Sequence, residues 1–252
     1  MKQIKYTFYL LSLILFIGCS SDDSGDSSGI PDNDLGLGQS AHDLLANDIF
    51  STMEIEVVYP EGFQPENESL QNLKSFLQQR TYKTSIDINT REIELNSEGP
   101  YSIEQIRSIE NNVRTSFNTE DKISVFIIFA NGKKQGDEGT SNTLGTAYQN
   151  TSIVIFQETI ISFTNAPGAP SKTSIETTTL THEFGHLLGL VGIGSEQQNE
   201  HEDPNAEAHC ITENCLMRAE AEFSSGIMGM FGDNIPDLGS ECILDLQANG
   251  GR

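Results

Sequence analysis

The chain has 252 residues and a formal net charge of −23 at pH 7, from 37 acidic and 14 basic residues. A surface this acidic repels nucleic acid and anionic lipid headgroups, so we exclude DNA and RNA as partners. The length allows one well-packed domain, which we expect to be a monomer.

The first 18 residues have the features of an export signal. Two lysines precede an apolar run over residues 8–18, which is too short to span a bilayer as a helix. The run ends in Phe-Ile-Gly-Cys at positions 16–19, which resembles the lipobox of bacterial lipoproteins, with phenylalanine where leucine is more usual. The resemblance implies acylation of Cys19 and an outer-membrane or cell-surface lipoprotein held to the membrane by lipid alone. The alternative is an ordinary secretory signal with an incidental cysteine.

A polar segment follows the signal. Serine, aspartate and glycine dominate residues 20–29, which carry too few apolar groups to fold. We therefore assign 19–48 to the lipidated cysteine and a flexible acidic tether. The remainder, 49–252, is expected to be one folded domain with an upper part, 49–189, and a lower part, 190–252.

Hydrophobic periodicity predicts the elements of the upper part. In chain order they are a strand at 53–59, a helix ending near Arg80, a strand at 84–89, a helix opened by a capping box at 102–105, an apolar strand at 123–130 and strands at 145–148 and 152–156. A break containing proline and glycine at 166–170 precedes a helix of roughly 18 residues. The order predicts an α/β (α+β) fold, a three-layer sandwich around a twisted, mixed and mostly parallel sheet.

The last predicted helix carries a His-Glu-x-x-His motif, which is followed three residues later by Gly189. His182 and His186 are four residues apart, so they project from the same face of the helix and can share one Zn²⁺ ion. Glu183, beside them, can act as a general base on a metal-bound water. Two buried histidines around a buried glutamate are costly without a metal, and neighbouring leucines favour burial of this helix.

The residues after the motif resemble the metzincin clan of zinc proteases. In that clan the motif continues Gly-x-x-His, but this chain has Gly192 at the histidine position. Further on, residues 209–217 read His-Cys-x4-Cys-x-Met, which looks like the archaemetzincin signature after an insertion at 190–208. The resemblance covers residues 181–217. It implies a metzincin-like sandwich with an active-site helix and a small irregular C-terminal subdomain.

The same resemblance implies roles for individual residues. His209 would be the third zinc ligand, with His201 as its competitor. Met217 would form the Met-turn beneath the metal, although methionine also fills ordinary core gaps.

Three cysteines, Cys210, Cys215 and Cys242, lie in the lower part. Archaemetzincins have a later Cys-x-x-Cys that completes a four-cysteine structural zinc site, and this chain offers only Cys242 there. We therefore expect a disulfide and one leftover thiol, with a partial metal cluster as the alternative. The sequence does not choose among the three pairings.

Together these features predict a zinc-dependent metalloendopeptidase that is anchored at the cell surface by lipid and cleaves protein or peptide substrates. His182, His186 and His209 would bind the metal and leave its fourth position to water, with Glu183 as the base. The segment 145–149 is our candidate for the edge strand that pairs with an extended substrate. The alternative is a binding lipoprotein that retains a metzincin scaffold without catalysis.

Overall fold

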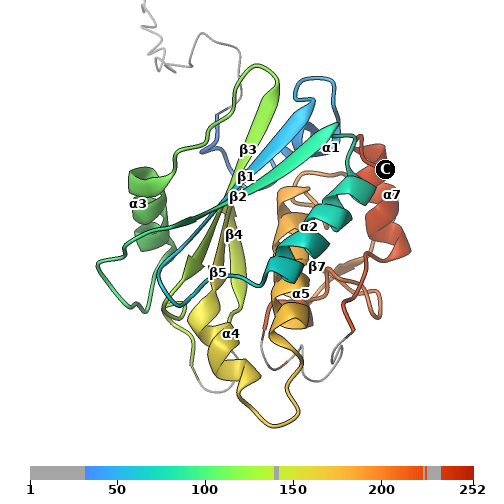
Figure 1. Ribbon diagram of the computed structural model, residues 1–252. Coiled ribbons are helices and arrows are strands. Elements are labelled where there is room, and N and C mark those ends of the chain that lie inside the picture. Colours follow the sequence, from blue (N-terminus) through green and yellow to red (C-terminus); the bar gives the residue numbers. More distant parts are fainter. Residues whose placement is uncertain (1–31, 139–141, 224, 226–233) are drawn as a thin grey trace, which may run out of the picture.

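A computed structural model describes residues 32–138, 142–223, 225 and 234–252. The signal segment, Cys19 and the first part of the assigned tether lie outside these residues. The centre of the fold is a five-stranded sheet in the order β2-β1-β3-β5-β4 (Figure 1). Its strands are β1 (Thr52–Tyr59), β2 (Ser85–Glu92), β3 (Lys122–Ala130), β4 (Gly145–Gln149) and β5 (Ser152–Phe156).

Four of the five strands run in parallel. β1 lies between β2 and β3 and pairs in parallel with both, and β5 continues the parallel sheet beside β3. β4 alone is antiparallel, and it forms one edge of the sheet next to β5. The mixed, mostly parallel sheet predicted from the sequence is thus present, and 145–149 lies on its edge.

Helices cover both faces of the sheet (Figure 1). α3 (Ile103–Val113) packs on one face, while α2 (Asn67–Arg80) and α5 (Lys172–Leu187) lie on the other. β3 shows how one strand supplies both cores, because successive side chains point to opposite faces. Val125 and Ile127 belong to the core on the α2 and α5 side, whereas Phe126 and Ile128 belong to the α3 side.

The predicted capping box begins α3. The Ser102 hydroxyl accepts a hydrogen bond from the Gln105 backbone N–H, and the Gln105 side chain accepts one from the Ser102 N–H. Two of the N–H groups that a helix leaves unpaired at its start are satisfied in this way.

The folded domain begins earlier than residue 49. α1 (Ala41–Leu45) lies inside the segment assigned to the tether, and both Leu44 and Leu45 are fully buried in the main core. Asn33 also donates hydrogen bonds to the Ser124 carbonyl oxygen and the Thr151 hydroxyl. The tether prediction is therefore wrong from about Asn33 onward, because apolar and amide groups after the acidic run find partners in the domain.

The lower part is irregular and contains short elements that the sequence analysis left unassigned. They are β6 (Glu202–Asp203), β7 (Ala206–Cys210), the 3₁₀ turn η1 (Ala219–Ala221) and α7 (Ser240–Ala248). β6 and β7 form a two-stranded antiparallel ribbon. α4 (Gln157–Thr164) was also not predicted and follows β5 directly. None of the helices in the described ranges has the length and apolar character needed to cross a bilayer.

Candidate metal centre

α5 is buried around almost its whole circumference. The Ser171 side chain caps its first turn by accepting the Ser174 N–H, and every residue from Ser174 to Leu187 is buried. Its threonines are tolerated inside because their hydroxyls bond to carbonyls one turn earlier, as Thr179 does to Ile175 and Thr181 to Thr177. A helix surrounded by protein on all sides is well placed to hold reactive groups rigidly.

Gly189 ends the helix and reverses the chain. Its φ of 74° is a left-handed conformation that glycine adopts at little cost. The Leu190 N–H bonds to the Gly185 carbonyl, and the Gly189 N–H bonds to the His186 carbonyl. This pattern is a Schellman motif, and it ends the motif helix at Leu187, one residue after His186.

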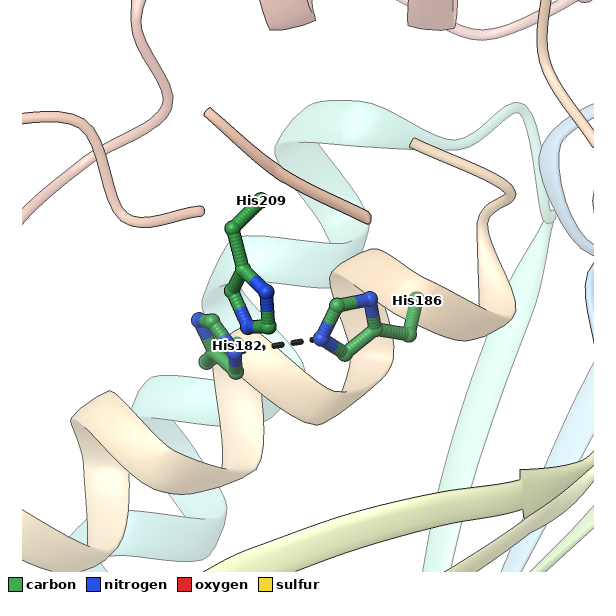
Figure 2. A group of neighbouring side chains, drawn as sticks. All are labelled: His182, His186 and His209. Atoms are coloured by element: carbon green, nitrogen blue, oxygen red, sulfur yellow. Dashed lines mark hydrogen bonds between the residues drawn. The ribbon is translucent and has the colours of Figure 1, made fainter. Parts of the chain in front are cut away.

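Three histidines meet above α5 (Figure 2). His182 and His186 come from successive turns of the helix, and His209 comes from the end of β7. One ring nitrogen from each lies within 4.8 Å of the others, and the Nε2 atoms of His182 and His186 are 3.1 Å apart. Two imidazoles bound to one tetrahedral zinc at 2.0–2.1 Å would have their nitrogens about 3.3 Å apart. The spacing therefore fits a shared metal.

Backbone carbonyls fix the orientation of two of these rings. His182 Nδ1 is 2.8 Å from the Leu216 carbonyl oxygen, and His209 Nδ1 is 2.8 Å from the Glu207 carbonyl oxygen. Because a carbonyl can only accept, Nδ1 carries the proton in both rings. In the neutral form of each ring Nε2 then has a free lone pair, which is the form that binds a metal.

Burial also keeps the helical pair neutral. It lowers the pKa of His182 to about 4, with the charge of His209 adding to the effect, and it lowers the pKa of His186 well below its ordinary value. Neutral imidazoles are the ligand form, so these two residues need release no proton to bind a cation at neutral pH.

Glu183 lies on the same helix, next to the histidines. Its Oε2 accepts a 2.7 Å hydrogen bond from the Ala147 N–H of the edge strand, while Oε1 is buried without a hydrogen-bond partner. Burial raises the pKa of this carboxyl well above its ordinary value, and the nearby Glu222 charge adds to the shift. Oε1 is thus the oxygen of Glu183 that is free to accept or donate a proton.

Met217 is fully buried, and its side chain lies against Gly185 of α5. Its carbonyl accepts a 2.7 Å hydrogen bond from the Cys210 N–H. This bond places the end of β7, which carries His209, directly beside the turn that carries Met217. The Met-turn role of Met217 stays a prediction.

His201 is not part of this group. It lies beside Cys210 and Asp245 instead, so His209 is the histidine that joins the helical pair.

The sequence analysis missed Glu222, whose Oε2 is 3.4 Å from His209 Nε2. Burial lowers the pKa of His209, but the contact with Glu222 outweighs it and the net shift is upward. No spacing rule links Glu222 to the motif, because η1 and tertiary packing bring it there.

The three cysteines of the lower part are free thiols in the structure, and the Sγ atoms of Cys215 and Cys242 are 3.6 Å apart. A disulfide requires about 2.05 Å. The disulfide expected from the sequence is therefore not formed here.

The comparison with known proteins shows that this chain resembles solved structures in its fold alone. No family model matches the sequence, and no curated protein matches it either. The chain is similar in structure to archaemetzincin from Methanopyrus kandleri, with a TM-score of 0.51 and 17% identity, over 79% of this chain and 96% of that one. It is also similar to metalloproteinase-II from Bacteroides fragilis, with a TM-score of 0.45 and 14% identity, over 81% of this chain and 55% of that one. The first likeness confirms the predicted sandwich, because this chain shares the fold of that archaemetzincin.

Proposed function

We propose that this protein is a zinc-dependent endopeptidase. The observation that carries the proposal is the convergence of three buried imidazoles, His182, His186 and His209, beside a carboxylate with a free oxygen. Packing three imidazoles against one another inside the protein is costly, and a shared cation would remove that cost. Three imidazole ligands and one open position are typical of catalytic zinc sites.

The residues present divide the chemistry among them. A bound zinc ion would lower the pKa of a coordinated water to about 7 and polarise a peptide carbonyl. Glu183 takes the proton at its free Oε1 and passes it to the leaving amine. Its other oxygen stays fixed on the Ala147 N–H, so the carboxylate cannot rotate away. His209 closes the ligand set from the lower part of the domain.

The substrate class follows from the edge strand. β4 pairs with β5 on one side only, and it lies against α5 next to Glu183. An unpaired strand edge can add an extended peptide as a further strand through backbone hydrogen bonds. We therefore expect cleavage within extended protein or peptide segments, with the peptide bond to be cut held near Glu183.

Replacing the base tests the mechanism. Glu183→Gln preserves shape and burial but removes the proton acceptor, so peptide cleavage should fall by about 10²-fold or more while zinc content stays unchanged. Cleavage of an unstructured protein substrate and elemental analysis of the same preparation measure both quantities.

His186→Ala is the matched control, because it should abolish zinc binding and cleavage together. A Glu183→Gln enzyme that cleaves as fast as the parent contradicts the mechanism. Zinc binding by the parent without cleavage of any peptide instead supports a scaffold that only binds.

The same proposal includes export and lipid attachment. Its support is the lipobox-like sequence that ends in Cys19 and the acidic segment after it. The protein would then act at the outer membrane or cell surface, with its catalytic domain on the solvent side of a lipid anchor.

A further inference from the structure

A second cluster of metal-ligating side chains lies in the lower part, on the far side of Cys210 from the candidate catalytic centre. His201, Cys210 and Cys242 are all buried, and one ligand atom from each lies within 4.8 Å of the others. Cys215 joins them through its 3.6 Å contact with Cys242. The four side chains come from the inserted segment, β7, the turn before Met217 and α7.

The distances in this cluster fit a tetrahedral metal. Two thiolates that bind zinc at about 2.3 Å have their sulfurs roughly 3.8 Å apart, and a thiolate and an imidazole have their ligand atoms roughly 3.6 Å apart. The structure gives 3.6 Å between the Cys215 and Cys242 sulfurs. It gives 3.2 Å and 4.0 Å from His201 Nδ1 to the sulfurs of Cys210 and Cys242.

Backbone N–H groups point at two of the sulfurs. Cys210 Sγ accepts from the Thr212 N–H at 3.4 Å, and Cys215 Sγ accepts from the Met217 N–H at 3.4 Å. In each case the donor is two residues after the cysteine, so the backbone turns around the sulfur. The Gly239 N–H adds a 3.2 Å contact to Cys215. Donors arranged in this way stabilise thiolates, which are the form that binds a metal.

A buried carboxylate orients the histidine. His201 Nε2 is 2.7 Å from Asp245 Oδ2, and the other Asp245 oxygen accepts the Gln198 N–H at 2.7 Å. Asp245 is fully buried. With Nε2 protonated and held by the carboxylate, Nδ1 faces the sulfurs with its lone pair free. Carboxylate–histidine pairs of this kind commonly support metal ligands.

We infer that His201, Cys210, Cys215 and Cys242 form a second, structural zinc site with a three-cysteine, one-histidine ligand set. The chain lacks the later Cys-x-x-Cys that would supply a fourth sulfur, and the inserted segment supplies an imidazole in its place. Four protein ligands leave no open position, so this site is structural and not catalytic.

The site connects the insertion to the catalytic centre. Cys210 directly follows His209, and Cys215 lies two residues before Met217. A metal bound to both cysteines, to His201 and to α7 would therefore fix the two backbone segments that present His209 and Met217. The insertion at 190–208 is then part of the framework of the active site.

Metal content and the absorption of the cobalt-substituted protein test this inference on the full chain. The parent should bind a second metal ion with thiolate-to-cobalt charge-transfer absorption, and this absorption should persist in a His182→Ala, His186→Ala double variant. His201→Ala should weaken binding of the second ion at least tenfold, and Asp245→Asn by about 10- to 100-fold. His201→Cys should restore tight binding and increase the charge-transfer absorption.

The exposed His42 provides a matched control, because it belongs to neither cluster and His42→Ala should leave the affinity for the second ion unchanged. Since His201→Ala could simply unfold the lower part, His201→Cys decides between a ligand and a packing role. A parent protein without thiolate-to-cobalt absorption overturns the site, as does a disulfide among these cysteines in non-reduced protein. Unchanged affinity in His201→Ala removes His201 from it. Failure of peptide cleavage alone leaves this site unaffected.

Discussion

At the scale of single residues, Gly185 is as important to the centre as the ligands around it. It lies in the middle of the His-Glu-x-x-His motif, and a Cβ placed on it would be 2.2 Å from Met217 Sδ. Met217 is fully buried, so its side chain has little room to move aside. The absence of a side chain at 185 therefore permits the turn that carries Met217 to approach the helix closely.

We expect Gly185→Ala to disturb this approach. Overpacking of a buried contact costs about 1–3 kcal/mol. Displacement of the Met217 turn should also weaken zinc binding, because the N–H of Cys210, the residue after His209, is hydrogen-bonded to the Met217 carbonyl. Thermal unfolding and zinc titration measure the two effects. Adding Met217→Ala should recover part of the lost stability, and strictly additive losses would contradict a direct clash.

At the scale of elements, α5 is held in place by a buried carboxylate as well as by apolar packing. Glu176 Oε2 accepts hydrogen bonds from the Glu66 N–H at 2.7 Å and the Ser69 hydroxyl at 2.8 Å, at the start of α2. Glu176 Oε1 accepts from the Gln157 side chain at 2.5 Å, at the start of α4. One side chain thus joins three helices below the metal centre.

Glu176→Ala should lower the free energy of unfolding by about 3 kcal/mol, because it leaves several buried donors without an acceptor. Urea unfolding followed by far-UV circular dichroism measures the loss. Glu68→Ala, at an exposed position on α2, is the matched control and should cost less than about 1 kcal/mol. Equal effects of the two substitutions would mean that the Glu176 network contributes nothing to holding the helices together.

At the scale of the whole molecule, the proposed catalytic centre is assembled from distant segments. α5 supplies the helical pair and Glu183, and β7 supplies His209 across the 190–208 insertion. The sheet edge at β4 holds Glu183 from above through the Ala147 N–H.

Cys19→Ser tests the lipid anchor. If Cys19 is acylated, the substitution should move the protein from the membrane fraction to the soluble fraction, because no other acyl attachment site is predicted. Detergent phase partitioning of cell fractions measures the distribution. Ser20→Ala, the neighbouring change, should leave it at the membrane, and a Cys19→Ser protein that still partitions with detergent contradicts the proposal.

Most elements of the upper part could be predicted from local patterns in the sequence. The continuous apolar run that became β3, the capping box of α3 and the His-Glu-x-x-His helix each depend on residues near one another in sequence. α1, α4 and α7 were missed because each is nine residues or shorter, too short for periodicity to be distinct.

The lower part was harder to predict from the sequence because its contacts join residues that are far apart in the chain. Glu222 lies near His209 because of η1, and His201 lies near Cys210 and Cys242 because of the β6–β7 ribbon and α7. From the sequence, His201 is predicted only as a competitor for the first metal. Its spacing from the motif does not show which group of side chains it lies beside.

The amino-acid sequence by itself determined the helical pair His182 and His186, the glutamate between them and the sheet that supports their helix, because these depend on periodicity within short segments. Only the tertiary structure decided that His209 approaches this pair while His201 turns toward the cysteines. His201 lies in the inserted segment and His209 at the end of the short strand β7, and the direction of such segments is set by what they pack against rather than by their own residues.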